Sequence, residues 1–272
     1  MKKLLVSAFA LFAVSSAYSQ ANRDVSTQDG NGNTATINQT GYQNLNRLLQ
    51  EGNNNVATVD QNEWWHENDA QSIGNNNSID VDQVGIWNTN VTDQYGDGNT
   101  AQTDQDGIIN DVIQLQVGDN NDTYAMQSGD VNYANQGQEG DGNQASSEQM
   151  GDYNLVYQDQ VGDNNMAIAT QNGDDNYIHQ LQLGDGNTAD YLQIGDGNYA
   201  DAHQSGDDNT ALGYQNGNGN TIYQYQTGDW NTADDWQVGS NNMADITQNG
   251  EDHFHYGTQV GSNNTMTVTQ SN

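Results

Sequence analysis

The chain has 272 residues, with 37 Asp and Glu against 4 Lys and Arg, a net charge of −33, and neither cysteine nor proline. This charge repels nucleic acid and anionic membranes, and the lack of cysteine excludes disulfides and cysteine-ligated metals. The absence of proline favours a backbone in which every N–H is available for a hydrogen-bonded ladder.

Residues 1–19 have the form of a secretory signal, in which two lysines precede a short apolar run. Ala17 and Ser19 occupy the small-residue positions before the expected cleavage site. The apolar run is shorter than the roughly 20 residues that cross a bilayer. We therefore expect an exported protein, with residues 20–27 forming a short segment before a repeat region at 28–272.

An 11-residue period runs through the repeat region. In steps of 11 from Gln28, Gln occupies 22 of 23 positions. The same step finds Gly at 21 of 22 positions from Gly30, and Asn at 20 of 22 positions from Asn33. Because no insertion or deletion interrupts this phase, a one-residue slip must have a structural cost.

Each 11-residue unit predicts a strand followed by a tight turn. In one unit, Asn187, Ala189, Tyr191 and Gln193 are two residues apart, so they project from one face of an extended segment. Glycine tolerates the positive φ of tight turns. The predicted turn glycines include Gly30, Gly41, Gly184, Gly195 and Gly261.

Alternate units differ, which doubles the period. Two residues before the periodic Gln, positions 114, 136, 158 and 180 are Gln, whereas the interleaved units mostly carry small residues there. The predicted fold class is therefore all-β, a β-solenoid of about eleven 22-residue strand-turn-strand coils forming two facing parallel sheets. At roughly 4.8 Å per coil the stack is about 50 Å long, and it is cross-β when assembled.

The inward columns of Gln and Asn need partners, because burying an unpaired amide costs about 1 to 3 kcal/mol. In a regular stack each amide donates to the identical amide one coil away and accepts from the one on the other side. We therefore expect continuous ladders of both residue types.

Neither end of the repeat region shows a cap. The repeat opens at Gln28, and the last strand, 265–270, stops two residues before the end of the sequence. Two open, matching sheet edges are a template for head-to-tail addition, which propagates as a filament. The sequence predicts a secreted subunit that polymerises with itself into a cross-β fibre.

The unit Q-x-G-x-x-N-x-A-x-x-x-Q, as it stands from Gln193 to Gln204, resembles the curlin repeat of curli, the functional amyloid fibres of bacterial biofilms. The resemblance implies an extracellular, cell-surface fibre with roles in adhesion and matrix building. It also implies export through an outer-membrane pore and nucleation by a minor subunit. Because the final repeat keeps the pattern, the chain is more similar to the major subunit than to the nucleator. By this resemblance, the residues that drive self-assembly are Gln28, Asn33, Gln39, Asn44, Gln248, Gln259, Asn264 and Gln270.

Acidic residues follow many turn glycines. We interpret them as solvated gatekeeper charges that delay premature aggregation. The alternative is a calcium site, because carboxylates on successive coils lie about 5 Å apart. The residues concerned include Asp97, Asp119, Asp163, Asp185 and Asp196.

Two stretches depart from the pattern. In the unit at 62–72, Glu63, His66 and Ser72 replace Gly, Asn and Gln. We interpret it as a decayed repeat that bulges from the stack; the alternative is a surface-active loop presenting Trp64 and Trp65. Near the C-terminus, His253 and His255 occupy inward columns, which we interpret as an irregular end repeat rather than a metal pair.

No catalytic constellation stands outside the repeat. We find no nucleophile with a base, no phosphate-binding loop and no paired catalytic carboxylates, so we expect no enzyme, small-molecule substrate, cofactor or metal. The alternatives to a fibre subunit are a monomeric calcium-binding β-roll and a surface adhesin. An ice-binding solenoid lacks support, because the outward positions 188, 190 and 192 carry no regular Thr array.

Overall fold

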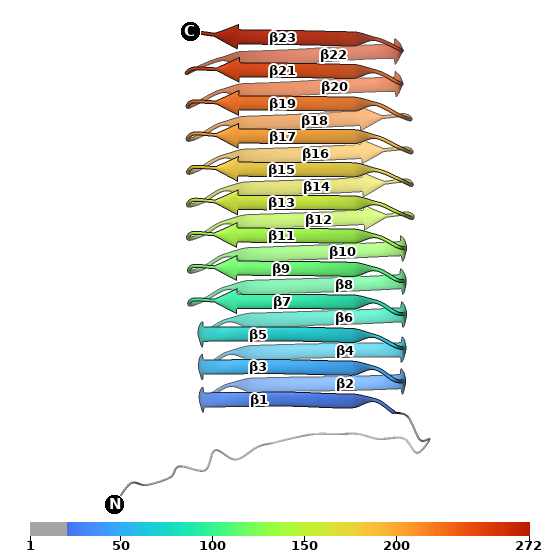
Figure 1. Ribbon diagram of the computed structural model, residues 1–272, viewed down its shortest axis with the longest axis vertical. Helices are drawn as coiled ribbons and strands as arrows, with labels where there is room; N and C mark the ends of the chain where they lie inside the picture. Colours follow the sequence, from blue (N-terminus) through green and yellow to red (C-terminus); the bar gives the residue numbers. More distant parts are fainter. Residues whose placement is uncertain (1–20) are drawn as a thin grey trace, which may run out of the picture.

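A computed structural model describes residues 21–272, and all regular elements in that range are β-strands. They wind into a stack in which successive strands alternate between two sheets (Figure 1). The predicted signal at 1–19 lies outside the described residues. Residues 23–27 of the predicted short segment belong to the first strand.

The odd-numbered strands form one sheet of twelve, hydrogen-bonded in the order of the chain. They are β1 (Arg23–Asn31), β3 (Leu45–Asn53), β5 (Glu67–Asn75), β7 (Thr89–Tyr95), β9 (Asp111–Val117), β11 (Tyr133–Glu139), β13 (Leu155–Val161), β15 (Tyr177–Leu183), β17 (Tyr199–Ser205), β19 (Thr221–Thr227), β21 (Met243–Asn249) and β23 (Thr265–Ser271).

The even-numbered strands form the second sheet, which has eleven strands. They are β2 (Thr34–Tyr42), β4 (Val56–Trp64), β6 (Ser78–Ile86), β8 (Thr100–Ile108), β10 (Asp122–Asp130), β12 (Gln144–Met150), β14 (Met166–Asn172), β16 (Thr188–Ile194), β18 (Thr210–Asn216), β20 (Thr232–Ser240) and β22 (Phe254–Ser262).

All pairings within the two sheets are parallel and keep a register of 22 residues. Gln28 faces Gln50 across β1 and β3, and Gln127 faces Gln149 across β10 and β12. The predicted all-β solenoid with a 22-residue coil and two parallel sheets is confirmed.

The core is a thin layer between the two sheets, filled by small apolar residues and amides. Ala189, Val156 and Ile178 are fully buried, and so are nearly all the periodic Gln and Asn side chains. Because a side chain's neighbours include its own column one coil away, this interior needs few large apolar residues. The exception is Tyr191, the largest fully buried side chain in the described range.

The unit at 62–72 stays in the stack, so the expected bulge is wrong. Glu63 pairs in register with Gly41 and Gly85, although its φ is 90°. The buried His66 keeps two bonds of the Asn it replaces: its backbone N–H donates to Asn44 Oδ1 at 3.0 Å, and its Nε2 lies 2.7 Å from the Asn62 carbonyl. The ladders on both sides hold the backbone in place despite the substitutions.

Within residues 21–272, no helix has the length and apolar character needed to cross a membrane.

Candidate functional site

Two Gln ladders run along the interior. In the even sheet the ladder is continuous from Gln39 to Gln259, with each Nε2 donating to the Oε1 of the Gln one coil later at 2.7 to 3.0 Å. In the odd sheet the same bonds run from Gln94 to Gln270 at 2.8 to 3.1 Å. The expected Gln ladders are confirmed in both sheets.

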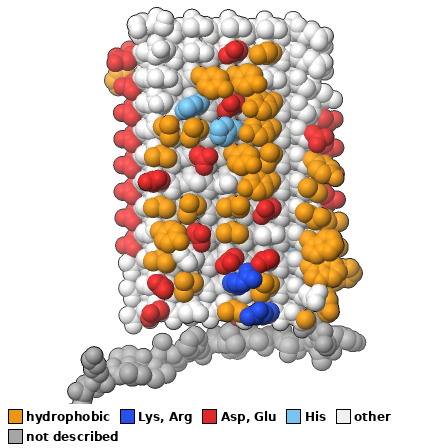
Figure 2. Space-filling model, viewed as in Figure 1, with side chains coloured by type: hydrophobic (Ala, Val, Ile, Leu, Met, Phe, Trp, Pro, Cys, Tyr) orange, Lys and Arg blue, Asp and Glu red, His pale blue; other side chains and the backbone are white. Residues whose placement is uncertain are grey.

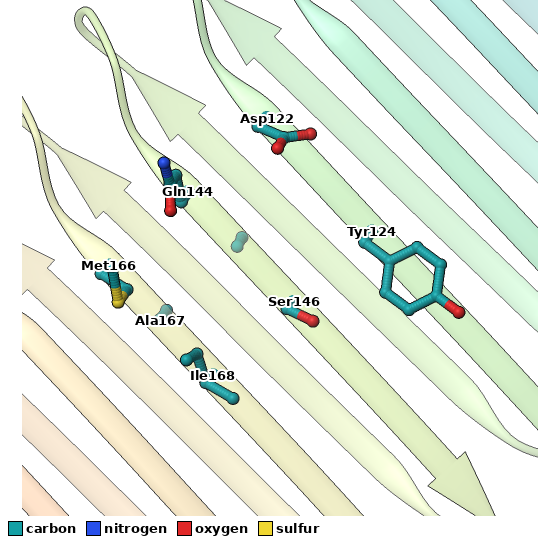
Figure 3. Close-up of a pocket in the computed structure, with 8 residues that line it drawn as sticks. Asp122, Tyr124, Gln144, Ser146, Met166, Ala167 and Ile168 are labelled. Carbon is teal, nitrogen blue, oxygen red and sulfur yellow. The ribbon is translucent and has the colours of Figure 1, made fainter.

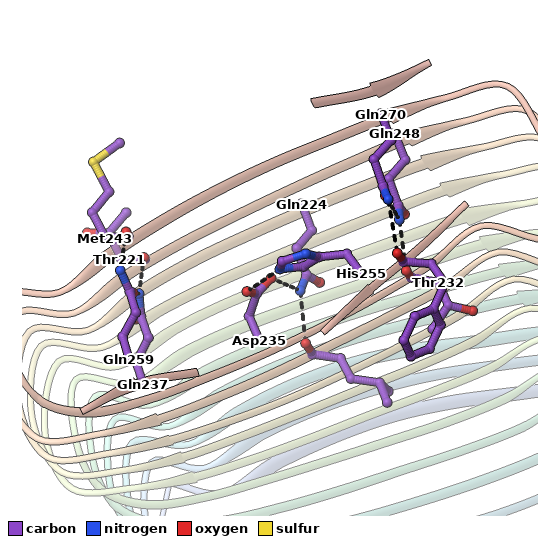
Figure 4. A network of polar contacts seen from close by, with 12 residues as sticks. Thr221, Gln224, Thr232, Asp235, Gln237, Met243, Gln248, His255, Gln259 and Gln270 are labelled. Atoms are coloured by element: carbon purple, nitrogen blue, oxygen red, sulfur yellow. Dashed lines mark hydrogen bonds and ion pairs between the residues drawn. The ribbon is translucent and has the colours of Figure 1, made fainter. Parts of the chain in front are cut away.

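The second proton of each Gln amide joins the two sheets. Gln248 Nε2 donates to the Thr232 carbonyl at 2.9 Å and to Gln270 Oε1 at 2.8 Å (Figure 4). The same 16-residue step across the sheets recurs at Gln237, which donates to the Thr221 carbonyl at 2.9 Å. A Gln amide within a ladder thus bonds both along the stack and across it, which explains why Gln occupies this position.

The odd-sheet ladder is interrupted at Ser72. Its side chain is too short to continue the Gln column, and its Oγ donates to Gln94 Oε1 at 3.0 Å. Gln50, one coil earlier, has no Gln to donate to along the stack and keeps its cross-sheet bond to the Thr34 carbonyl at 3.2 Å. This substitution therefore shortens the long odd-sheet ladder without leaving either Gln amide unbonded.

The Asn column works differently, and the expected amide-to-amide ladder is wrong for its N-terminal part. Asn55 accepts the backbone N–H of Asn77 at 3.0 Å, while its own Nδ2 donates to the carbonyls of Glu51 and Gly74 at 3.1 and 2.9 Å. The side chain of Asn is one methylene shorter than that of Gln, so its amide serves the turns. Direct Asn-to-Asn side-chain bonds join most of the coils from Asn132 onward.

The turn glycines are needed because the coils approach closely there. Gly184 has φ +120°, and a Cβ on it would lie 2.2 Å from the Gly206 carbonyl oxygen. Gly195 has φ +108° and the same constraint from Gly217. Gly30, Gly41 and Gly261 also have positive φ, so all five predicted turn glycines lie in conformations that favour glycine.

The acidic turn residues bond to the backbone of the stack. Asp119 Oδ1 accepts the backbone N–H of Asp97 at 2.7 Å, and Asp185 Oδ1 accepts that of Asp163 at 2.8 Å. Asp196 accepts the N–H of Asp174 in the other row of turns at 3.2 Å. The carboxylates are exposed, and those between odd and even strands form the red column on the left of Figure 2.

No group of three or more His, Asp or Glu suited to holding a metal occurs within residues 21–272. His253 lies in the Asn column with its Nε2 3.2 Å from the Asn249 carbonyl, whereas the buried His255 lies 3.1 Å from Asp235 Oδ1. The two imidazoles therefore have separate partners.

Asp235 lies at the centre of a buried polar cluster near the C-terminal end (Figure 4). Its carboxylate accepts a bond from Gln224 Nε2 at 2.7 Å and lies beside His255. Tyr191 donates its hydroxyl to Gln224 Oε1. Burial raises the pKa of Asp235, and the bonds from Gln224 and the nearby His255 oppose this effect in part. Sequence analysis missed this cluster, although Asp235 in an otherwise small or apolar inward column signals it.

An aromatic strip lies on the turns of the N-terminal coils. We give this name to Tyr42, Trp64, Trp65 and Trp87, each exposed by 37 to 51%. The rings of Trp65 and Trp87 stack at 5.1 Å, and Tyr42 and Trp64 contact Trp65 edge-on. They form part of the orange area at the lower right of Figure 2. The sequence indicated Trp64 and Trp65, and the 22-residue step from Trp65 could have added Trp87.

A shallow hollow lies on the outer face of β10, β12 and β14 (Figure 3). Asp122, Tyr124, Ser146, Met166 and Ile168 are among its lining residues. Asp122 and Tyr124 are the titratable groups that line it, and the Ser146 hydroxyl has no imidazole beside it there. This lining offers no nucleophile paired with a base.

The stack ends in four edge strands, two at each end. β1 and β23 are the outermost strands of the odd sheet, and β2 and β22 those of the even sheet. Gln28 and Gln39, with Asn33 and Asn44, lie in the N-terminal coils; Gln248, Gln259, Asn264 and Gln270 lie in the C-terminal ones. The structure thus gathers the predicted self-assembly residues at the two ends.

Comparison with protein-family models supports this geometry. The model described as the curlin associated repeat matches residues 30–62, 195–223, 225–250 and 239–271. The search of curated proteins found no match. The chain therefore matches the curlin associated repeat at four places, one at the N-terminal end of the stack and three in the C-terminal third of the chain.

Proposed function

We propose that the chain is a secreted structural subunit that assembles head to tail with further copies of itself into an extracellular amyloid fibre of the curli type. The observation that carries this proposal is that, within residues 21–272, the outermost strands at the two ends of one regular stack have no further strand beside them, and that these two edges are complementary. A parallel sheet edge with unpaired backbone groups is a template for another strand.

The Gln ladders make the two ends complementary. At the C-terminal end, Gln259 and Gln270 each donate one proton across the sheets, to the carbonyls of Met243 and Phe254, and the second proton points along the axis with no acceptor in residues 21–272. At the N-terminal end, Gln28 and Gln39 donate inward to Gln50 and Gln61. Their Oε1 atoms accept no bond within the described residues. One end offers donors and the other acceptors.

The remaining features support a surface role. The family implies export through an outer-membrane pore, nucleation by a minor subunit, and a place in the biofilm matrix of a bacterium, and the predicted signal at 1–19 supports export. The exposed turn carboxylates serve as gatekeepers that keep the chain dispersed before assembly. The aromatic strip supplies an apolar surface for adhesion.

The proposal is tested with the chain lacking residues 1–19. Purified protein should form fibres that bind thioflavin and give a reflection near 4.7 Å in aligned X-ray scattering. Protein that stays monomeric for days contradicts the proposal. Recovery of assembly only on adding Ca²⁺ also contradicts it and supports a calcium-binding β-roll.

A variant series tests the role of the ends. Replacing Gln28, Gln39, Gln259 and Gln270 by Ala removes both ladder bonds at each subunit interface, each worth about 0.5 to 1.5 kcal/mol. Elongation from wild-type seeds should slow by roughly tenfold.

The matched control is replacement of Gln149 and Gln160 by Ala. This change weakens the fold within a subunit but leaves both edges intact, so it should lower the urea midpoint and change seeded elongation less. Equal effects of the two sets on elongation contradict the end-template mechanism.

A further inference from the structure

The number of strands determines how two copies stack. The described residues form 23 strands, twelve in the odd sheet and eleven in the even sheet. Because the chain winds continuously, each strand lies half a coil further along the axis than the one before it, as Figure 1 shows for β1, β2 and β3. The two ends are therefore stepped, with β1 and β23 projecting half a coil beyond β2 and β22.

Two arrangements bring the edges of two copies together. If the second copy is only translated along the axis, its β1 pairs with β23 and its β2 faces β22. The projecting strands β23 and β1 then pair in the odd sheet, and a gap one strand wide remains between β22 and β2 in the even sheet. If the second copy is also rotated by half a turn, its β1 pairs with β22 and its β2 with β23, and both sheets continue without a gap.

The two sheets are similar enough for such a rotation. In the odd sheet, Gln50 Nε2 donates to the carbonyl of Thr34, 16 residues earlier in the even sheet, at 3.2 Å. In the even sheet, Gln61 Nε2 donates to the carbonyl of Leu45, 16 residues earlier in the odd sheet, at 3.0 Å. A half-turn about the axis therefore places the Gln-to-carbonyl bonds of one sheet where the equivalent bonds of the other sheet were.

The inward columns at the ends distinguish the two arrangements. On β23, Met266 and Val268 face inward, and on β2, Ala35 and Ile37 do so. Rotation places Ala35 over Met266 and Ile37 over Val268, so that apolar residues continue apolar columns. Translation places a carboxylate, Asp24 of β1, over Met266.

The pairing of β1 with β22 also favours the rotated arrangement. On β22, the inward His255 and Gly257 end two adjacent columns, and the buried Asp235 lies in the column of Gly257, within 3.1 Å of His255 Nε2. Rotation places Asp24 of the next copy beside His255 and Ser26 beside Gly257. The His255 imidazole, which already lies beside Asp235 of its own copy, then has a second carboxylate one coil further along its column, and Ser26 and Gly257 match in size.

The outward residues also match after rotation. Thr265 and Thr267 of β23 meet Thr34 and Thr36 of β2, whereas translation places Arg23 and Val25 of β1 beside them.

We propose that successive copies of this chain stack with a half-turn rotation about the fibre axis, so that β1 of each copy pairs with β22 of the previous copy and β2 with β23. This inference rests on the proposed fibre function and specifies its interface. The subunits form a two-fold screw with a rise of about 55 Å, at roughly 2.4 Å for each of the 23 strands. The acidic turn column and the aromatic strip then alternate between the two sides of the fibre.

Engineered cysteines test the register, because the natural chain has none. Laterally adjacent residues in paired strands lie about 4.8 Å apart, within the Cα range that a disulfide spans. After rotation the outward Thr269 lies beside Asn38 of the next copy; after translation it lies beside Thr27. In one copy these positions are at opposite ends of the stack, so only bonds between copies form.

Fibres of the double variant Thr269→Cys with Asn38→Cys, oxidised and then dissolved in denaturant without reductant, should give a ladder of covalent oligomers. The matched double variant Thr269→Cys with Thr27→Cys should give monomers. A second rotated pair, Thr258→Cys with Thr27→Cys, should also cross-link. The reverse result, with oligomers only from Thr269→Cys with Thr27→Cys, overturns the half-turn but leaves the fibre function intact.

Fibres in which none of the three variants cross-links overturn the edge-to-edge interface. Failure of the cysteine-free chain to form any fibre is a different result, because it refutes the proposed function itself. Thioflavin binding and the 4.7 Å reflection, measured on every sample, separate these outcomes.

Discussion

At the scale of single residues, the amide type is matched to its position in the coil. Gln reaches both the next Gln and the opposite sheet, as Gln248 does toward Gln270 and Thr232. Asn, one methylene shorter, donates to backbone carbonyls near the turns, as Asn55 does to Glu51 in its own coil and to Gly74 one coil later. The two amides are therefore not interchangeable, although both are buried and both repeat every 11 residues.

Tyr191 and Gly213 form a size-matched pair one coil apart. A Cβ on Gly213 would lie 2.3 Å from Tyr191 Cε1. Gly213→Ala should therefore overpack the core and destabilise the fold by about 1 to 3 kcal/mol. Tyr191→Ala should cost about 3 to 5 kcal/mol through the cavity it leaves. The double variant should be more stable than the sum predicts, which urea unfolding at low concentration, before fibres form, can measure.

The control for this pair is Gly137→Ala. Its Cβ would meet only the Asp159 carboxylate oxygen, at 2.9 Å, and that side chain can rotate on the outer face. Its effect should be small and independent of Tyr191. Additive effects of Gly213→Ala and Tyr191→Ala contradict the steric pairing.

The buried Asp235 should make the stability depend on pH. Its pKa is raised by burial, so the folded state binds its proton more tightly than the unfolded state does. Its contribution is full below the pKa of an unfolded Asp and is lost as the pH rises through the folded-state pKa. The urea midpoint should therefore fall as the pH rises above about 4, the ordinary pKa of an unfolded Asp.

Asp235→Asn keeps the shape and removes the ionisation, so it should reduce that fall. An unchanged pH slope in Asp235→Asn contradicts the assignment.

At the scale of strands and turns, the sequence predicted most of the fold because its phase is never broken. Gln at every eleventh position determined the strand positions, and the alternation at Gln114 and Gln136 determined the 22-residue coil. That the unit at 62–72 stays in the stack was not predictable from its own residues. Glu63 adopts a positive φ because Gly41 and Gly85 on the neighbouring coils hold its backbone in register.

The turns show the same limit of sequence reasoning. Acidic turn residues such as Asp119 were interpreted as solvated gatekeeper charges, and the exposed Asp119 also accepts a backbone N–H from the previous coil. That bond depends on the position of the turn 22 residues earlier in the chain, and not on local sequence. Composition predicted the charge of the turns, whereas the contact required the three-dimensional stack.

At the scale of the whole molecule, the parity of the strand count matters more than the exact count. The odd number of strands can be read from the sequence, because there are 23 periodic positions from Gln28 to Gln270. What this number means for stacking depends on the half-coil step between the two sheets, which Figure 1 shows. An odd number requires a half-turn for gap-free stacking, and an even number requires none.

Removing one strand should therefore change the partner of a given residue across the subunit interface. A chain starting at Asn33 lacks β1 and retains 22 strands, and the rest should fold because each coil contacts only its neighbours. Its β2 should then pair with β22 of the previous copy, which brings Asn38 beside Thr258. Asn38→Cys should cross-link with Thr258→Cys in the shortened chain, but with Thr269→Cys in the longer one. Non-reducing gels of dissolved fibres measure this exchange, and an unchanged partner after the deletion contradicts the dependence on strand parity.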